Sequence, residues 1–491
     1  MIEQLPILQV LVPLMSAPLV LLFRSGLIAW LLTFIASSVA FAISIFLVRQ
    51  AMVQPEIVTV IGGWLAPWGI EYRVDMLNAL VLLLVSGIST ICLFFARKSV
   101  ALEIAEQDHS LFYTAWLLCL TGLLGITITG DAFNVFVFLE ISSLSSYVMI
   151  AMGRDRKALA ASFQYLVMGT IGATFILIGI GMLYMSTGSL NMADLARLLP
   201  EVEGQKVLRS AFAFLTVGIG LKLAMFPLHL WLPNAYAYAP SAVSAFLAGT
   251  ATKVAVYMLL RFVYSVFGFE FSFDAMPLSE ILLVLGVAAI LITSVVAIFQ
   301  DNLKRMLAYS SVAQIGYMLV GVGLATADGL TAAITHVFNH ALIKTALFLA
   351  LGCLVYRMGS VSLTHLSGAS KHMPWTMAAF LLGGLSLIGV PLTTGFVSKW
   401  LLVTAAIDMG YWPLAVVVLI GSLLAVIYIW RVVEVTYMRA SDSPREIREA
   451  PISMLLPTWI LIAANIYFGI FTDINIGISE IAAGWLKGLG V

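Results

Sequence analysis

Long apolar runs, separated by short polar segments, follow one another along almost the whole chain. A helix of about 18 or more apolar residues is long enough to cross a bilayer. The pattern therefore predicts an all-α polytopic membrane protein with about fourteen transmembrane helices. The expected spans are residues 6–23, 26–48, 75–96, 111–129, 132–152, 160–186, 210–228, 241–266, 278–299, 306–326, 330–356, 374–407, 412–433 and 452–472.

Proline and glycine interrupt two of these spans. The seventh contains "LKLAMFPLHLWLPNAYAYAP" and the twelfth contains "LSLIGVPLTTGFVSKW". Proline removes a backbone donor and clashes with the preceding turn, and unwound backbone at membrane depth is tolerated only inside protein or beside water. Interrupted helices at matching positions of two halves are typical of inverted repeats around an ion path. We therefore predict two inverted five-helix repeats, spans 4–8 and 9–13, with helices 7 and 12 broken.

This pattern divides the chain into four parts. Residues 1–110 hold the first three helices, 111–266 the first repeat, 278–433 the second repeat, and 434–491 a loop and the last helix. The amino-terminal segment "MIEQLPILQV" lacks a basic region, so we expect no cleaved signal peptide.

Composition supports a membrane protein and adds little else. The chain is 62% hydrophobic and 10% charged, whereas soluble domains contain about 25% charged residues. Its formal net charge is zero, so nothing suggests a nucleic-acid partner. The three cysteines, Cys92, Cys119 and Cys353, stand alone in apolar runs. That pattern is typical of buried small side chains, and it predicts no disulfide, metal cluster, redox centre or cofactor.

Lysine and arginine set the expected orientation. An even number of spans puts both termini on one side, and basic residues are commoner in cytoplasmic loops. The terminus side has seven: Arg49, Arg73, Arg197, Lys206, Arg209, Arg261 and Lys487. The other side has fourteen: Arg24, Arg97, Lys98, Arg154, Arg156, Lys157, Lys304, Arg305, Arg357, Lys371, Arg431, Arg439, Arg445 and Arg448. The bias predicts that both termini lie outside the cytoplasm, in a bacterial or archaeal cytoplasmic membrane.

The remaining four of the 25 basic residues fall inside predicted spans. They are Lys222, Lys253, Lys344 and Lys399. A charge at the centre of a membrane helix costs about 2.5–3.5 kcal/mol on insertion scales, so such residues commonly mark ion paths. Each lysine has a simpler interpretation, in which it snorkels to an interface or closes a structural ion pair. Lys399, near a predicted break, fits that interpretation best.

These lysines form part of a longer polar series. Glu140 lies near the middle of the fifth span, and we expect it to pair with Lys222 as a gate. Lys253 follows in the eighth span. His336, His340 and Lys344 recur every four residues, so they form one helical stripe about 12 Å long. Histidine can pass protons near neutral pH, and Lys399 ends the series.

Other polar residues carry simpler expectations. His340 has an alternative role as the cap of a backbone carbonyl, and no HExxH pattern supports metal binding by the two histidines. His229, beside the first break, is expected to line the mouth of that break, with a role in the proton path as the alternative, and Asp75 is expected to lie at an interface. His365 and His372 are expected to be solvated. Four serines that follow Glu140 are expected to hold water or bond carbonyls: Ser142, Ser143, Ser145 and Ser146.

Five segments together resemble the antiporter-like proteins of respiratory complex I, membrane-bound hydrogenases and Mrp cation/proton antiporters. They are "GDAFNVFVFLEISSLSSY", "KLAMFPLHLWLPNAYAYAPSAVSAFLAG", "LKRMLAYSSVAQIGYM", "NHALIKTALFLALG" and "GVPLTTGFVSKW". The resemblance covers about residues 70–430 and is greatest to the D subunit of Mrp antiporters, which lysine at 399 suits.

The resemblance implies a proton path within a larger assembly. Glu140 and Lys222 would be the gate, Lys253, His336, His340 and Lys344 the hydrated axis, and Lys399 the terminal site. Partners would be other membrane subunits, protons, sodium ions and the lipid bilayer. The first expected function is a proton-translocating subunit of a sodium/proton antiporter. Alternatives are the pump of an energy-converting hydrogenase or complex I relative, a subunit of an inorganic-carbon uptake complex, and a structural scaffold.

Overall fold

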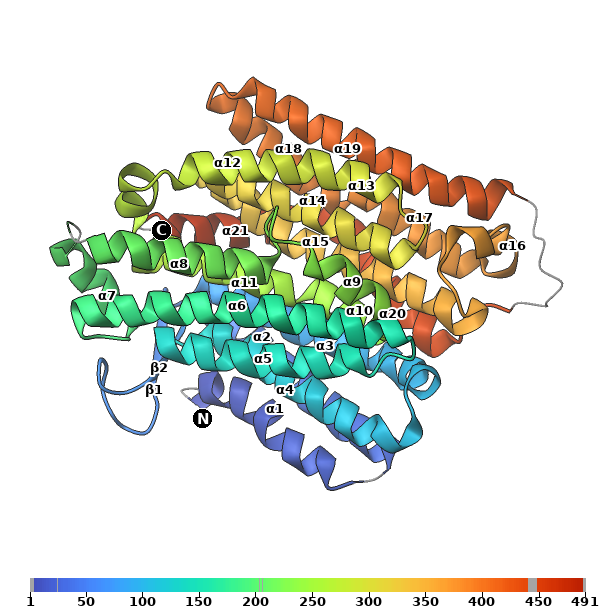
Figure 1. The fold of residues 1–491 in the computed structure, drawn as a ribbon, viewed down its shortest axis with the longest axis horizontal. Coiled ribbons are helices and arrows are strands. Elements are labelled where there is room, and N and C mark those ends of the chain that lie inside the picture. Colours follow the sequence, from blue (N-terminus) through green and yellow to red (C-terminus); the bar gives the residue numbers. More distant parts are fainter. Residues whose placement is uncertain (1–3, 24, 203, 205, 440–447, 489–491) are drawn as a thin grey trace.

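The computed structural model describes residues 4–23, 25–202, 204, 206–439 and 448–488. Long helices lie side by side along the horizontal axis of Figure 1 and form one bundle. In the first half these elements are α1 (Leu5–Leu21), α2 (Gly26–Ala51), β1 (Ile57–Val60), β2 (Glu71–Val74), α3 (Met76–Glu103), η2 (Glu106–Asp108), α4 (His109–Ile128), α5 (Ala132–Ala151), α6 (Arg156–Thr187), α7 (Met192–Leu198), η3 (Leu199–Val202), α8 (Lys206–Leu223), α9 (Trp231–Tyr238), α10 (Ser241–Gly249), α11 (Ala251–Leu260) and η4 (Arg261–Val266).

The second half continues the same bundle. Its elements are η5 (Glu270–Ala275), α12 (Leu278–Ala288), η6 (Ala289–Thr293), α13 (Ser294–Ile298), α14 (Leu303–Gly323), α15 (Ala327–Met358), η7 (Leu363–His365), α16 (Ala369–His372), α17 (Pro374–Ile388), α18 (Thr394–Asp408), α19 (Trp412–Val433), η8 (Glu434–Met438), α20 (Ile452–Ile470) and α21 (Asp473–Leu486). The antiparallel β1–β2 hairpin pairs Ile57 with Val74 and lies at one end of the bundle (Figure 1).

The predicted all-α membrane architecture is confirmed. Each of the fourteen predicted spans coincides with one helix or with consecutive helical segments. Eleven helical segments of the described chain are long and apolar enough to cross a membrane, and α1 and α17 are shorter apolar helices. Outward side chains such as Leu19, Val284 and Leu423 are more than half exposed, as expected of a surface that faces lipid. Helix α21, which packs on α15 and α3, was not predicted.

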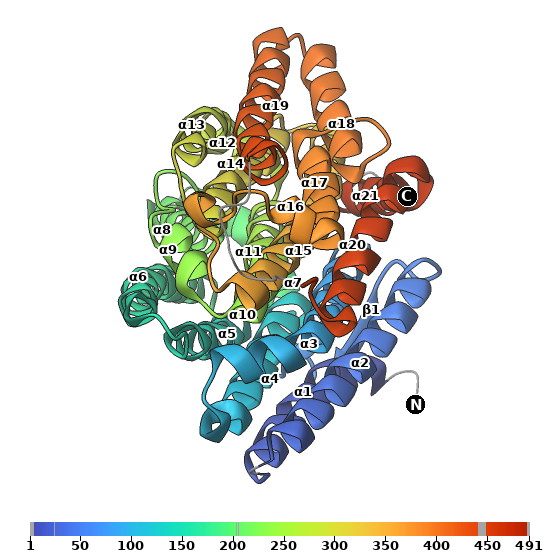
Figure 2. The same cartoon turned by 90° about the vertical axis from the view of Figure 1, so that its right-hand side faces the viewer.

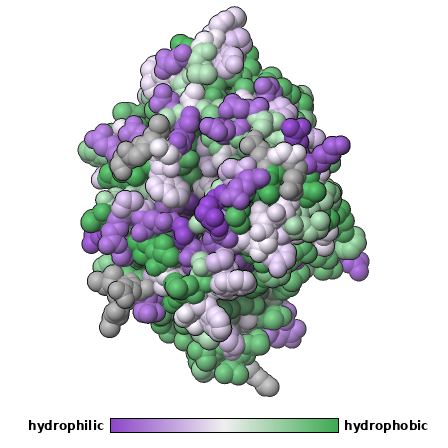
Figure 3. Space-filling view, turned by 90° about the vertical axis from the view of Figure 1, so that its left-hand side faces the viewer, coloured by the Kyte–Doolittle hydropathy of each residue, from purple (hydrophilic) through white to green (hydrophobic). Residues whose placement is uncertain are grey.

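Both ends of the described chain lie at the same end of the bundle. Helix α1 begins and α21 ends on the left of Figure 1, as an even number of spans requires. We call this end the terminus side. Figure 3 shows its face, where hydrophilic side chains gather across the middle. Two of the basic residues used to predict the orientation, Arg24 and Arg445, lie outside the described residues.

The two predicted breaks are confirmed. Helix α8 ends at Leu223, before Ala224 in a left-handed conformation (φ 59°) and Pro227. Helix α17 ends at Ile388, where Gly389 adopts φ 94° at little steric cost because it lacks a Cβ. A third break was not predicted: Thr250 leaves helical geometry (φ −122°, ψ −59°) between α10 and α11. The division into inverted repeats and the four-part division of the chain stay predictions.

Helix α15 occupies the centre of the bundle. It is surrounded by other helices in the end-on view of Figure 2, and it packs against α10, α14, α17, α18, α20 and α21. Its most apolar 18-residue window is 94% buried, although the same helix carries the histidine–lysine stripe. Thr326 caps its first turn by accepting a hydrogen bond from the Gly329 amide, and Gly359 (φ 71°) ends it. The stripe is therefore held in protein, away from lipid.

Helix α3 is fastened to both ends of the eighth span. Asp75 caps α3 and forms an ion pair with Arg261 at 2.7 Å. At the other end of α3, Glu103 Oε2 accepts hydrogen bonds from the Ser241 amide at 2.9 Å and from its hydroxyl at 3.1 Å. Arg261, counted among the basic residues of the terminus side, is therefore buried against Asp75 at that end of the eighth span. The expected interface position of Asp75 stays a prediction.

Candidate functional site

The four lysines predicted inside spans are all buried in the protein. Their exposed fractions are 8% for Lys222, 1% for Lys253, 0% for Lys344 and 5% for Lys399. None of them lies within 4.0 Å of a carboxylate in the part of the chain that the structure describes. Their ammonium groups donate to hydroxyl and carbonyl oxygens instead. Snorkelling and structural ion pairs, the two simpler interpretations, therefore do not account for them.

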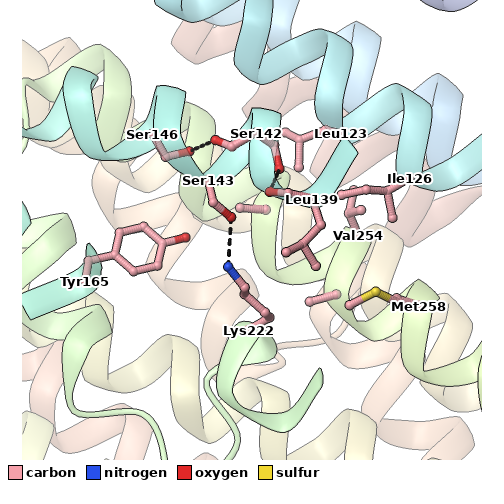
Figure 4. Close-up of a pocket in the computed structure, with 12 residues that line it drawn as sticks. Leu123, Ile126, Leu139, Ser142, Ser143, Ser146, Tyr165, Lys222, Val254 and Met258 are labelled. Carbon is pink, nitrogen blue, oxygen red and sulfur yellow. Dashed lines mark hydrogen bonds between the residues drawn. The ribbon is translucent and has the colours of Figure 1, made fainter. Parts of the chain in front are cut away.

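Lys222 ends the first broken helix and reaches across to α5. Its Nζ donates to the Ser143 hydroxyl at 2.8 Å, as the dashed line in Figure 4 shows. Glu140 lies one turn earlier on α5, and its Oε1 is buried without a hydrogen-bond partner among the described residues. The predicted direct contact between Glu140 and Lys222 is therefore wrong. Glu140 lies three residues before Ser143, so both side chains project from the same side of α5.

The serines after Glu140 differ in what they contact. Ser142, Ser145 and Ser146 donate to carbonyls of their own helix, as one alternative predicted. Ser143 is the one that meets a lysine. A cavity of about 30 Å³ beside it is lined by Lys222, by three of the serines (Ser142, Ser143 and Ser146) and by four α11 residues, Ala251, Val254, Ala255 and Met258 (Figure 4). That volume can hold a water molecule between Lys222 and the helix that carries Lys253.

Replacing Ser143 by alanine is expected to slow transport without stopping it. The change removes the hydroxyl that holds Lys222, and one hydrogen bond contributes about 0.5–1.5 kcal/mol, so a roughly twofold to tenfold loss follows. Ser145→Ala is the matched control, since that hydroxyl bonds the Ile141 carbonyl of its own helix. Transport is measured as proton flux into membrane vesicles. Equal rates for the two variants would show that the hydrogen bond between Ser143 and Lys222 does not contribute to transport.

Lys253 depends on the unpredicted break at Thr250. Its Nζ donates to the Ala248 carbonyl at 2.5 Å and to the Thr252 hydroxyl at 3.3 Å. In a continuous helix the Ala248 carbonyl would accept from the amide four residues later. The break frees this carbonyl for the ammonium. Gly249 permits the geometry, because a Cβ there would lie 3.0 Å from Ile88 and would collide with Thr345 of α15.

The stripe on α15 faces the interior along its whole length. His336 and His340 are 3% and 0% exposed, and their rings are parallel with centroids 5.8 Å apart. His336 Nδ1 lies 2.8 Å from the Ser398 hydroxyl, which adjoins Lys399. Lys344 donates to the Leu307 carbonyl at 2.8 Å and to the Ser310 hydroxyl of α14. The predicted stripe thus contacts two neighbouring helices.

Three imidazole nitrogens of the stripe lack a partner among the described residues. They are His336 Nε2 and both ring nitrogens of His340. The alternative role of His340, a cap on a backbone carbonyl, is therefore wrong. Buried polar groups are almost always hydrogen-bonded to protein or to water, so these nitrogens suit a hydrated interior.

Lys399 occupies the second predicted break. Its Nζ donates to the carbonyls of Leu387 and Ile388, both at 2.9 Å, and to the Ser422 hydroxyl at 3.0 Å. Those carbonyls end α17 and have no amide partner in a following turn. The Tyr317 ring lies 4.9 Å from Nζ and 5.7 Å from the His336 ring. Tyr317, which the sequence did not single out, thus links the end of the stripe to Lys399.

The remaining histidines depart in part from expectation. His229 is buried and lies between the rings of Phe226 and Tyr309, with centroids at 5.3 and 6.2 Å, so it does not line an open mouth. His365 bonds the Ser360 hydroxyl at 3.2 Å near the surface, as expected of a solvated side chain. The three cysteines are free and buried, as expected of isolated small side chains in apolar runs.

Sequence reasoning also missed a fifth buried lysine. Lys304 was assigned to a loop, yet it is 4% exposed and donates to the Ala239 carbonyl at 3.0 Å. It lies in the first turn of α14, two residues after the helix cap Asn302, where a loop and a helix cannot be separated by hydropathy alone. It lines a surface cavity of about 590 Å³ together with Glu103.

The hydrogen-bond partners of each lysine suit both its protonated and its neutral form. An ammonium has three N–H donors and a neutral amine keeps two, so carbonyl and hydroxyl partners suit both forms. A carboxylate partner would instead fix the charge. The polar groups run from α8 through α11 and α15 to α18, and they connect the two broken helices through the centre of the bundle.

Comparison with known proteins agrees with this architecture. Residues 129–425 match the family described as NADH:quinone oxidoreductase/Mrp antiporter, transmembrane. The chain is 40% identical to the N subunit of the NADH-quinone oxidoreductase of Desulforudis audaxviator, over 96% of this chain and 97% of that one. It is 31% identical to the D subunit of the Na⁺/H⁺ antiporter of Alkalihalophilus pseudofirmus, over 87% and 85%.

A solved structure extends the agreement to the whole fold. The Mrp complex of Dietzia sp. DQ12-45-1b contains a chain that superposes with a TM-score of 0.90 at 25% identity, covering 100% of this chain and 98% of that one. That structure is a multisubunit membrane complex, so other membrane subunits are the partners of this fold. With a family match over most of its length and a bundle of membrane helices with interrupted spans, the chain belongs to the antiporter-like membrane proteins shared by Mrp antiporters and NADH:quinone oxidoreductases.

Proposed function

We propose that this chain moves protons across a prokaryotic cytoplasmic membrane along the axis from Lys222 through Lys253, Lys344, His340 and His336 to Lys399. One observation carries the proposal: these buried cationic and imidazole groups have only neutral oxygen partners or none among the described residues. Charged side chains are costly inside a membrane, so they are rare there unless they have a function. A purely structural buried charge would be expected to have a partner of opposite charge. Glu140 acts on Lys222 electrostatically from the next turn of α5.

The first candidate for the driving force is a sodium gradient, in a complex of the Mrp type. The likeness to the D subunit of a Na⁺/H⁺ antiporter and to the Mrp complex supports it, as does lysine at position 399 in the second break. Sodium would need clustered oxygen ligands, which partner subunits would supply. In this arrangement both termini face away from the cytoplasm.

The second candidate is a redox-driven pump. The 40% identity to a component of NADH-quinone oxidoreductase supports it. In that case the electron carriers would belong to other subunits, and the axis of this chain would respond to chemistry elsewhere. The role of this chain is the same in both candidates, because each requires the protein to hold, pass and release protons.

Identification of the companion subunits distinguishes sodium/proton exchange from a redox-driven pump. The complex is extracted from its native membrane in mild detergent by means of a tag on this chain, and its components are identified by mass spectrometry. Companions that are all small membrane subunits support sodium/proton exchange, which is then measured with a pH-sensitive dye in vesicles. Companions with iron–sulfur or nickel centres support the pump. Isolation as a lone chain would contradict both.

A further inference from the structure

A second polar stripe leaves the axis on the helix that carries Lys253. Tyr257 and Arg261 follow it at intervals of four residues, across the boundary between α11 and η4. At about 1.5 Å per residue, the three positions cover about 12 Å of the helix towards the terminus side. All three side chains are buried, with Tyr257 at 3% and Arg261 at 8% exposure. The proton path proposed above uses Lys253 alone of these three.

The outer end of this stripe is closed by polar contacts. Arg261 Nη2 lies 2.7 Å from Asp75 Oδ2, and Arg261 Nε donates to the Tyr257 hydroxyl at 3.2 Å. The Tyr257 hydroxyl in turn donates to the Thr127 carbonyl of α4 at 2.8 Å. Asp75, Arg261 and Tyr257 therefore form one connected cluster, which we call the terminus-side cluster.

A surface cavity begins where the cluster ends. It has a volume of about 270 Å³, several times what a water molecule occupies. All three residues of the cluster line it, together with Asn78 and Ser265. Its outer wall carries Glu56 and Arg73 of the hairpin segment. The side chains of Arg73 and Glu56 are 30% and 33% exposed, so the cavity reaches the surface beside them.

Helix α21 covers one side of this cavity. Trp485 lines it, and its ring lies 5.2 Å from the Arg261 guanidinium. Lys487 anchors the end of α21 by donating to the Ala325 carbonyl at 2.9 Å. The arginine is thus held between a carboxylate on one helix and an indole on another.

The inner end of the stripe is not joined to the cluster. The Lys253 ammonium is turned towards Ala248 and Thr252, on the far side of its own Cα from Tyr257. No hydrogen bond joins Lys253 to Tyr257 in the described chain. The helix therefore carries all three polar residues, but no hydrogen bond joins Lys253 to the other two in the described chain. This arrangement is expected of a path for water that is closed.

We propose that the terminus-side cluster is the gate through which the central axis exchanges protons with the terminus side of the membrane. This inference rests on the proton translocation proposed above. When the Asp75–Arg261 pair separates, water enters the stripe and reaches Lys253. The ammonium then gives one proton to that water and becomes a neutral amine, and the proton leaves through the cavity. The axis returns a proton to Lys253 after the pair has closed.

Cysteine accessibility tests the gate in the assembled complex. The three native cysteines are buried, so background labelling is low. A probe at Lys253→Cys reports on the inner end, and a probe at Ser265→Cys reports on the cavity. Both are exposed to a membrane-impermeant maleimide from the terminus side, with and without Asp75→Asn. Asparagine can still cap α3, so this change removes the charge while keeping the helix end.

The Asp75→Asn change is expected to expose Lys253→Cys without changing the exposure of Ser265→Cys. Ser265→Cys is labelled in both backgrounds, whereas Lys253→Cys is protected with Asp75 present and reacts at least about tenfold faster with Asp75→Asn. Asp194→Asn is the matched control, because it breaks an exposed pair with Arg197 on the same face and leaves the cluster intact. Tyr257→Phe, which keeps the packing and removes the hydroxyl, is expected to raise labelling of Lys253→Cys by a smaller factor.

Two outcomes would overturn the gate. One is protection of Ser265→Cys from the terminus side, which would mean that the cavity is closed to solvent. The other is unchanged labelling of Lys253→Cys in both the Asp75→Asn and the Tyr257→Phe complexes, with assembly verified by co-purification. Labelling measures the access of solvent to Lys253→Cys and not proton transport. A failure of the proposed proton translocation would therefore appear in the flux assay and not in the labelling, so the two proposals can fail separately.

Discussion

The Lys344→Met variant is expected to lose proton translocation by about 100-fold or more, the size of effect typical when a proton-transfer group is removed. Lys344 is fully buried at the centre of the bundle and joins α15 to α14 through Leu307 and Ser310. Methionine fills a similar volume without a titratable group, so the helices stay packed. Flux is measured with a pH-sensitive dye in inverted vesicles, under the drive that the companion subunits indicate.

Lys344→Arg separates proton transfer from charge. Arginine keeps the positive charge and its donors, but it does not release a proton at working pH. We expect this variant to assemble and to be as inactive as Lys344→Met. Normal flux in the arginine variant would mean that position 344 supplies only a fixed charge, and the axis would then have to bypass it.

Lys222→Ala is expected to abolish transport while the complex still assembles. Lys222 contacts the side of α5 that carries Glu140 and Ser143, and it borders the cavity that leads to α11. Its removal leaves Glu140 without this opposing charge and the Ser143 hydroxyl without its donor. The readouts are proton flux in vesicles and the yield of co-purified partners.

Arg209→Ala is the matched control for Lys222→Ala. It removes a basic residue from the exposed part of the same helix, α8, and should leave flux unchanged. Full activity of Lys222→Ala would contradict the proposed role of this lysine. Loss of partner subunits from Lys222→Ala but not from Arg209→Ala would show instead that Lys222 holds the assembly together.

The sequence predicted the helices and most of the axis because both leave strong local signals. A lysine such as Lys253 is conspicuous in an apolar run, and Pro227 and Pro391 stand in the two predicted breaks, although Pro13, Pro18 and Pro457 lie inside continuous helices. The arrangement of side chains between helices has no such signal. Glu140 and Lys222 have opposite charges and suitable depths, yet the turn of α5 presents Ser143 to the lysine instead.

Residues near the ends of spans were predicted least well. Arg261 and Lys304 lie near the ends of predicted spans, where hydropathy changes, so the sequence did not indicate that their side chains are buried. Tertiary contacts decide their burial: Asp75 for Arg261 and the Ala239 carbonyl for Lys304. The break at Thr250 contains no proline. It follows from close packing of Gly249 against α15, which only the folded structure reveals.

The two-ended attachment of α3 has a mechanical consequence. With 28 residues, this helix is about 42 Å long at about 1.5 Å per residue, so it works as a strut across the membrane. If the proposed gate opens, Glu103 would still hold α10 while Arg261 moves away from Asp75, and the break at Thr250 would let α11 and η4 move without α10. The two halves of the eighth span would then move separately, and one end of the span would stay closed while the other opens.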